Sequence, residues 1–172
     1  MLKKIYFTFL FLLTAFLVNS QVVINEYSAS NFDSHLDNYG EYEDWVELYN
    51  TTNSDIDLNG WSLTDKPSNL NKWSFPGSFI VSANSVAIVY CSGLNELVGG
   101  VAHTNFKITQ TKAGEVFVLS DAGGNIIDSA RAVPAQKSHS RGRDVNGGTT
   151  WSVFTTATPN TTNSGAMLEY AP

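Results

Sequence analysis

Glu26 and Glu47 are the pair of residues in this 172-residue chain most suited to chemistry, because each stands inside a short apolar run. Carboxyl groups about 5–10 Å apart on one sheet can cleave a glycosidic bond, one as the acid and the other as nucleophile or base. The alternative is that each carboxylate accepts hydrogen bonds from backbone amides or a tryptophan N–H. A cleft around the pair would favour a hydrolase, and an occluded, hydrogen-bonded pair would favour a non-catalytic domain.

An acidic stretch is the second candidate site. Its five carboxylates fall in what we expect to be one loop that enters a strand: Asp33, Asp37, Glu41, Glu43 and Asp44. Calcium takes about six to eight oxygen ligands from loops of this kind, but the spacing differs from that of the helix–loop–helix calcium motif. We therefore expect no cofactor, and we keep weak calcium binding by this loop as the hypothesis to test against a simply solvated loop.

Other catalytic arrangements find little support in the sequence. His35, His103 and His139 show no pair at zinc-ligand spacing, and we expect them to be solvated or in turns. The local Ser138-His139-Ser140 stretch has no orienting acid beside it, and the chain lacks a G-x-S-x-G elbow. Gly142, between two arginines, is expected to serve a turn. We predict no catalytic residues.

The first twenty residues predict export. Lys3 and Lys4 precede an apolar run over Ile5–Val18, and small and polar residues follow where a signal peptidase would cut after Ser20. The run is shorter than the roughly 20 apolar residues of a membrane span, and we expect no span in the mature chain. Loss of the two lysines changes the formal charge from −6 to −8. We expect a secreted or cell-surface protein that does not bind nucleic acid, since its charge repels phosphates.

Short β-strands must position these residues. Turn-forming residues interrupt the chain about every 8–12 residues, no long helical period occurs, and the runs between are rich in β-branched and aromatic residues. We predict strands over Val22–Ala29, Asp44–Tyr49, Trp61–Thr64, Ser78–Val81, Val86–Cys91, Glu115–Ser120, Ile126–Ala130 and Trp151–Phe154. Hairpin turns are predicted at Asp121–Asn125 and at Asn146-Gly147-Gly148.

These elements predict an all-β sandwich over residues 21–163, followed by a linker or tail over 164–172 that leads into a larger exported protein or assembly. Four tryptophans are expected to fill its core, with Trp73 the one most suited to an exposed, sugar-stacking position: Trp45, Trp61, Trp73 and Trp151. The single cysteine, Cys91, is expected to be a small buried core residue.

Several segments, taken in order, resemble the lamin-tail domain family. They are Val23–Glu26, Gly40–Asn50, Asp57–Asp65, Lys72–Pro76, His103–Lys107, Gly114–Leu119, and finally Ser140–Arg143 with Trp151 and Thr158–Asn160. The likeness covers nearly all of Val22–Asn163, and Gly40–Asn50 is its strongest part. It implies an immunoglobulin-like β-sandwich and an accessory role in an exported bacterial protein.

The resemblance favours a non-catalytic module that acts in binding, spacing or surface assembly. Two alternatives stay open. One is a carbohydrate-binding, adhesin-like module, for which Trp73 or another aromatic should be exposed. The other is a small glycoside hydrolase using Glu26 and Glu47. The protein or carbohydrate partner is not identified by the sequence.

Overall fold

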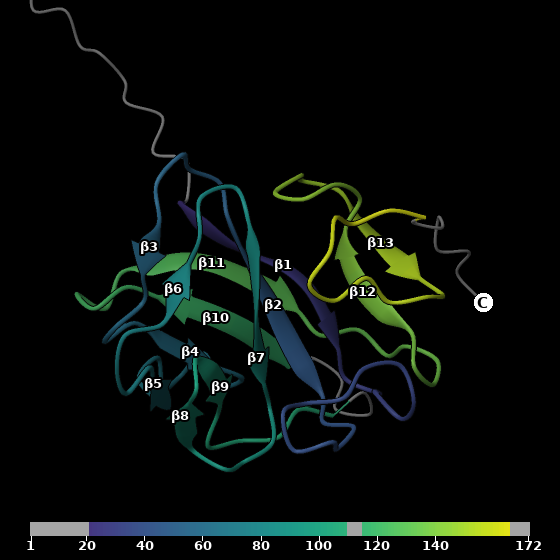
Figure 1. The fold of residues 1–172 in the computed structure, drawn as a ribbon, viewed down its shortest axis with the longest axis horizontal. Helices are drawn as coiled ribbons and strands as arrows, with labels where there is room; N and C mark the ends of the chain where they lie inside the picture. Colours follow the sequence, from purple (N-terminus) through teal and green to yellow (C-terminus); the bar gives the residue numbers. More distant parts are fainter. Residues whose placement is uncertain (1–20, 110–114, 166–172) are drawn as a thin grey trace, which may run out of the picture.

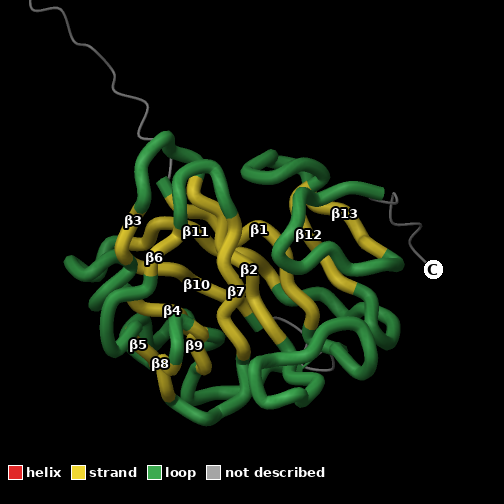
Figure 2. The backbone as a smooth tube through the Cα atoms, viewed as in Figure 1, coloured by secondary structure: helices red, strands yellow, loops and turns green. Residues whose placement is uncertain are grey.

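The computed structural model describes residues 21–109 and 115–165, and all regular elements in these residues are β-strands (Figure 1, Figure 2). Within this part of the chain no helix is long and apolar enough to cross a membrane. The expected signal peptide over residues 1–20 lies outside the described residues, as do residues 166–172 of the expected tail.

The larger sheet has seven strands in the order β13-β12-β1-β2-β7-β9-β8. Their bounds are β1 Val22–Ser28, β2 Trp45–Asn50, β7 Val86–Tyr90, β8 Glu96–Val98, β9 Val101–His103, β12 Ser140–Arg143 and β13 Trp151–Phe154. The pair β7–β9 is parallel, and the other neighbours are antiparallel. The strands β12 and β13 therefore extend the sheet beyond β1, at the yellow-green end of the molecule in Figure 1.

The second sheet has four strands in the order β11-β10-β4-β5, and a small sheet pairs β3 with β6. The bounds are β3 Ile56–Asp57, β4 Ser62–Thr64, β5 Trp73–Ser74, β6 Ile80–Val81, β10 Val116–Ser120 and β11 Ile126–Arg131. In Figure 1 the strands β10 and β11 run across the direction of β2 and β7, as in two layers packed face to face. The predicted all-β, immunoglobulin-like sandwich is confirmed.

All eight predicted strands are present, with ends that differ by at most two residues. Both predicted hairpins are present too, joining β10 to β11 and β12 to β13. Sequence analysis missed β3, β5, β8, β9 and β12, which have two to four residues each. A strand so short shows no alternation of its own, and only its pairing partner defines it.

The side chains of β2 alternate between two clusters, as a period of two residues requires. Val46 and Leu48 point into the main core between the sheets, together with Leu63 and Phe117. Trp45 faces the other way and packs in a second cluster with Ile88 and Tyr90. The larger sheet thus has an apolar cluster on each face, and its outer face needs a cover of its own.

Two irregular segments provide that cover. The loop over residues 29–44, between β1 and β2, stacks His35 on Tyr90 with ring centroids 6.0 Å apart. The segment over residues 155–163, after β13, places the backbone amides of Thr158 and Asn160 on side chains of β1 and β2. The main core on one face and this cover on the other together bury all seven residues of β1.

A β-bulge in β1 lies where the larger sheet contacts β11 of the second sheet. The pairing with β2 shifts register between Ile24 and Glu26, so the amide of Ile24 donates to Asp128 Oδ2 of β11 at 2.7 Å. Arg143 of β12 donates from Nε to the Ile24 carbonyl at 2.8 Å and forms an ion pair with Asp128 at 2.8 Å. The bulge thereby ties strands of both sheets together.

Cys91 and the four tryptophans are the residues that the sequence placed in the core. Cys91 is fully buried, as expected. Trp45 is fully buried, while Trp61 and Trp151 are partly buried and pack against the main core. Trp73 is 2% exposed and lies in the main core as expected, so the alternative that it forms a sugar platform is excluded. Polar neighbours in sequence suggested exposure, but Trp73 lies in β5 and its ring packs on Phe75 at 4.7 Å.

Replacing Trp45 by alanine should lower the free energy of unfolding by about 3–5 kcal/mol, the usual cost of emptying a buried aromatic site. Trp61→Ala should cost less, because Trp61 is only partly buried. Urea midpoints give the measurement. Ile126→Ala, at a side chain 59% exposed, is the control and should stay within about 0.5 kcal/mol of the wild type. A Trp45→Ala loss below about 1 kcal/mol would contradict the assignment.

Candidate functional site

The structure brings Glu26 and Glu47 together. They lie opposite each other in neighbouring strands, because the bulge in β1 sets Glu26 in register with Glu47 of β2. Both side chains are completely buried on the outer side of the sheet, under the segment that follows β13. Two adjacent buried carboxylates are costly unless hydrogen-bond donors surround them.

Donors from the C-terminal part of the chain satisfy Glu26. Its Oε1 accepts from Ser140 Oγ at 2.5 Å and from the Thr158 amide at 2.9 Å. Its Oε2 accepts from Thr158 Oγ1 at 2.6 Å. The partners lie 114 and 132 residues away along the chain, so Glu26 fastens β12 and the covering segment to β1.

Glu47 has two donors. Its Oε1 accepts from Asn25 Nδ2 at 2.9 Å, and its Oε2 accepts from the Asn160 amide at 2.8 Å. Asn25 also donates to Asn163 Oδ1 at 3.1 Å, and Asn163 Nδ2 donates to the Arg143 carbonyl at 2.6 Å. The carboxylates and amides thus form one network, which holds the covering segment on the sheet.

Gly142 makes room for this network. It pairs with Glu26 across β1 and β12, and a Cβ at its position would lie 2.9 Å from Asn163 Nδ2 and 2.9 Å from Glu26 Cγ. The expectation that Gly142 serves a turn is therefore wrong: it lies inside β12. The close approach of the neighbouring strand and of the covering segment requires glycine there.

Burial raises the pKa of both carboxyl groups. Removal from water is the largest cause for Glu26 and Glu47, and the hydrogen bonds oppose it in each case. The neighbouring Glu26 also raises the pKa of Glu47, which reaches about 8. A raised pKa suits a general acid, but a sugar would have to reach the carboxyl group, and here neither carboxylate meets solvent. The arrangement is the occluded, hydrogen-bonded pair that favours a non-catalytic domain.

Within the described residues, four of the five acidic side chains of the predicted cation site have separate partners, and the exception is Glu41. Asp33 accepts from Ser138 Oγ and lies 3.7 Å from Lys137 Nζ. The Oδ1 of Asp37 accepts from the amides of Tyr39 and Glu41, at 2.8 and 2.9 Å.

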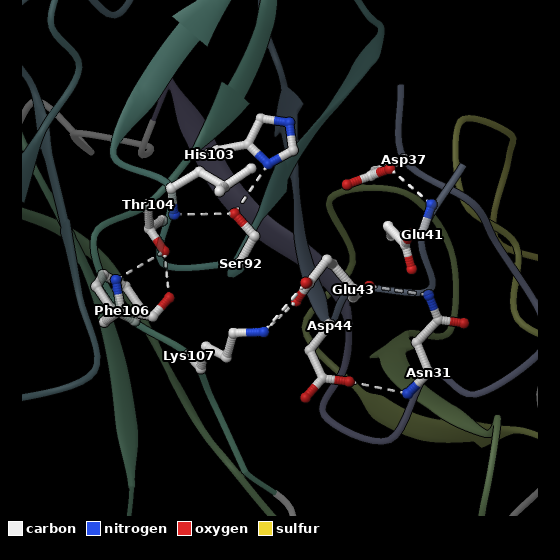
Figure 3. Close-up of polar contacts among 11 residues, drawn as sticks. Asn31, Asp37, Glu41, Glu43, Asp44, Ser92, His103, Thr104, Phe106 and Lys107 are labelled. Carbon is white, nitrogen blue, oxygen red and sulfur yellow. Dashed lines mark hydrogen bonds and ion pairs between the residues drawn. The ribbon is translucent and has the colours of Figure 1, made fainter. Parts of the chain in front are cut away.

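The side chains of Glu43 and Asp44 are held in the same way. Glu43 forms an ion pair with Lys107 at 3.0 Å, and Asp44 Oδ1 accepts from the Asn31 amide at 2.9 Å. In Figure 3 Lys107 reaches toward Glu43, while Asp44 turns toward Asn31. Within residues 21–109 and 115–165 no three acidic, histidine or cysteine side chains are arranged to hold a metal ion. Calcium binding by this loop stays a hypothesis.

Desolvation is also the main reason why the pKa of Asp44 is raised, to about 6. Glu43 and Glu115 raise it further, whereas the Asn31 amide and Lys107 lower it. Asp44 is half-buried, and its hydrogen bond from the Asn31 backbone amide fixes the loop.

The outer face of the sheet also holds two histidines. The Nδ1 of His103 lies 2.9 Å from Ser92 Oγ, and its Nε2 lies 2.7 Å from Asn38 Oδ1 (Figure 3 shows the serine contact). The His103 ring stacks on Tyr90 at 5.2 Å, and His35 stacks on the same tyrosine. The expectation that His103 is solvated or in a turn is wrong, because it ends β9 and is fully buried. Its contact with Ser92 is likewise buried, while its contact with Asn38 holds the 29–44 loop to the sheet.

Sequence analysis missed the exposed aromatic residues of the 29–44 loop. Phe32, Tyr39 and Tyr42 are about half exposed, although their flanking residues are fixed by hydrogen bonds. Their alternation with acidic residues was the signal that could have found them, since aromatic residues in a polar loop do not contribute to a strand or a core.

A family model described as Lamin Tail Domain matches residues 18–133. No curated protein matches the chain. The matched range includes β1, β2 and both buried glutamates, but it ends before β12. The resemblance seen in Ser140–Arg143, Trp151 and Thr158–Asn160 lies beyond the matched residues and stays a prediction.

Glu47 should make the protein less stable as the pH rises toward about 8. Its pKa is about 8 in the folded chain against an ordinary 4.5, so between these values the folded state holds a proton that the unfolded state has lost. The stabilisation is complete below the unfolded pKa and is lost as the pH rises through the folded one. Urea midpoints from about pH 5 to about pH 9 measure this slope. The Glu47→Gln variant should show a flatter slope of stability against pH, whereas the control variant Glu41→Gln should keep the wild-type slope. Identical profiles for wild type and Glu47→Gln would contradict the burial argument.

Thermal melts in excess calcium and in chelator should coincide, because four of the five acidic side chains of the 29–44 loop already have partners within the protein. Ligand binding to the folded state alone would raise the melting temperature. The control is the Asp37→Asn, Glu41→Gln double variant. A rise in calcium that this variant abolishes would instead establish a cation site.

Proposed function

Because this chain belongs to the lamin tail domain family, we propose that it is a binding and spacing module of an exported protein, without catalytic activity of its own. The family is one of non-enzymatic, immunoglobulin-like β domains. The single observation that carries the proposal is the state of Glu26 and Glu47. Their carboxylates are buried and engaged by donors, and they fasten the covering segment.

The N-terminal sequence supports export. The basic start, the apolar run over Ile5–Val18 and the polar residues after it have the order of a signal peptide. Cleavage after Ser20 would leave the larger sheet intact, since β1 begins at Val22 and pairs with Asn50 from that residue onward. Gln21 would then carry the new amino terminus.

A binding role is supported by the exposed side chains. The described surface has several large apolar residues that are about half exposed, and four of them belong to the loop over residues 29–44: Phe32, Leu36, Tyr39 and Tyr42. Large exposed apolar groups gathered in one loop mark interaction sites more often than isolated ones do. A module that acted only as a spacer would need a polar surface on this loop and no exposed apolar side chains.

Carbohydrate binding is the second candidate, and the buried tryptophans count against it. Trp45 and Trp73 are at most 2% exposed, so neither can form a stacking platform. The remaining platform would consist of Phe32, Tyr39 and Tyr42, set among carboxylates.

The test uses two measurements on the exported product. Mass spectrometry should find Gln21 at the amino terminus, and a product that keeps the Ile5–Val18 run would contradict export. Purified protein incubated with chromogenic glycosides should release no more chromophore than its Glu26→Gln, Glu47→Gln variant. Hydrolysis that this variant abolishes would overturn the non-catalytic assignment.

A further inference from the structure

Five apolar side chains are exposed around the loop between β1 and β2, and we call this surface the loop face: Phe32, Leu36, Tyr39, Tyr42 and Leu94. Each is between 45% and 57% exposed. The first four come from the loop itself, and Leu94 precedes β8 at the edge of the larger sheet. Carboxylates of the same loop and of β8 are interleaved with them.

The loop is rigidly held although it has no regular structure. Asn31 acts as its central support, donating from Nδ2 to the carbonyls of His35 and Glu43 at 2.6 and 2.8 Å. Asp44 accepts from the Asn31 amide, and Asp37 accepts from the amides two and four residues ahead. A loop fixed in this way loses little conformational entropy when a partner binds.

Contacts with the larger sheet also fix the 29–44 loop. His35 stacks on Tyr90, and its Nε2 lies 3.0 Å from the tyrosine hydroxyl. Tyr39 packs beside His103 at 5.6 Å and donates its hydroxyl proton to Glu96 Oε1 of β8 at 2.6 Å. The exposed part of Tyr39 is therefore presented in one orientation, which is how aromatic anchors of protein interfaces are arranged.

A hollow of about 340 Å³ lies in the loop face, lined by Asp37, Tyr39, Glu41, Glu43, Leu94 and Glu96. None of these lining residues is cationic, although Lys107 reaches Glu43 from one side. Figure 3 shows three of these acidic residues, Asp37, Glu41 and Glu43. The hollow thus combines two apolar side chains with a surplus of carboxylates.

We propose that the loop face is the docking surface for an extended, basic polypeptide segment. This inference rests on the binding role proposed above and names its partner by chemistry. An apolar side chain of the partner enters the hollow between Tyr39 and Leu94, and flanking lysine or arginine side chains pair with Glu41 and Glu96. The charge of the rim selects a cationic partner and disfavours nucleic acid and anionic lipid.

The test measures fluorescence anisotropy of a labelled peptide of alternating lysine and leucine, titrated with the purified protein. We expect binding that weakens as salt is added, since exposed charges are screened. A glutamate–leucine peptide should not bind. A lysine–glycine peptide should bind more weakly, because it has charge and no apolar anchor.

Variants locate the binding surface. Leu94→Ala, and separately the Glu41→Gln, Glu96→Gln pair, should each raise Kd about tenfold, a typical loss for an interface anchor. The matched controls are Ile126→Ala, an apolar residue exposed on β11, and the Asp55→Asn, Asp121→Asn pair, which removes the same charge elsewhere. Both controls should bind like the wild type. Unchanged melting temperatures will show that the variants are folded.

Several outcomes would overturn the docking proposal. Equal weakening by the Asp55→Asn, Asp121→Asn pair would reduce the binding to general attraction between opposite charges. If Leu94→Ala binds the lysine–leucine peptide with wild-type affinity, the hollow is not part of the interface. Binding of soluble glycans that Tyr39→Ala abolishes, without binding of the lysine–leucine peptide, would assign the surface to carbohydrate. If the peptide does not bind, this inference is refuted. The proposed function would still stand, provided that the exported product begins at Gln21 and hydrolyses no glycoside.

Discussion

The buried carboxylates of Glu26 and Glu47 impose the constraint on which the rest of the larger sheet depends. Two adjacent carboxyl groups cannot be removed from water unless donors replace the lost hydration. The donors come from β12 and from the segment after β13, with the amides of Thr158 and Asn160 each placed on one carboxylate. Two side chains in β1 and β2 thereby hold the chain to the sheet at residues 140, 158 and 160.

The same constraint links the range matched by the family model to strands of the larger sheet that lie beyond it. The match ends at residue 133, with both glutamates inside it and their donors Ser140, Thr158 and Asn160 outside. A sheet that ended at β1 would leave the two carboxylates without these donors. The strands β12 and β13 complete the sheet, and the covering segment completes its outer face.

The outer face of the larger sheet is covered at both ends, and the two covers differ in what they leave exposed. The C-terminal segment uses its polar groups to satisfy the buried glutamates. The 29–44 loop turns His35 and Asp44 inward, and it leaves Phe32, Tyr39 and Tyr42 partly in solvent. One cover thus stabilises the fold, while the other presents a fixed apolar surface among carboxylates, which is where a partner is most readily accommodated.

The sequence by itself determined the eight longer or more apolar strands, the two hairpins and the two faces of β2. Alternation and turn residues are local signals, so Val46 and Leu48 could be placed opposite Trp45 without a structure. Only the tertiary structure decided which polar groups meet. Glu26 finds its amide donor 132 residues away, and Gly142 is required by a neighbouring strand and not by a turn. The burial of His103 depends in the same way on distant partners, because a single sequence shows spacing along the chain but not which segments pack together in space.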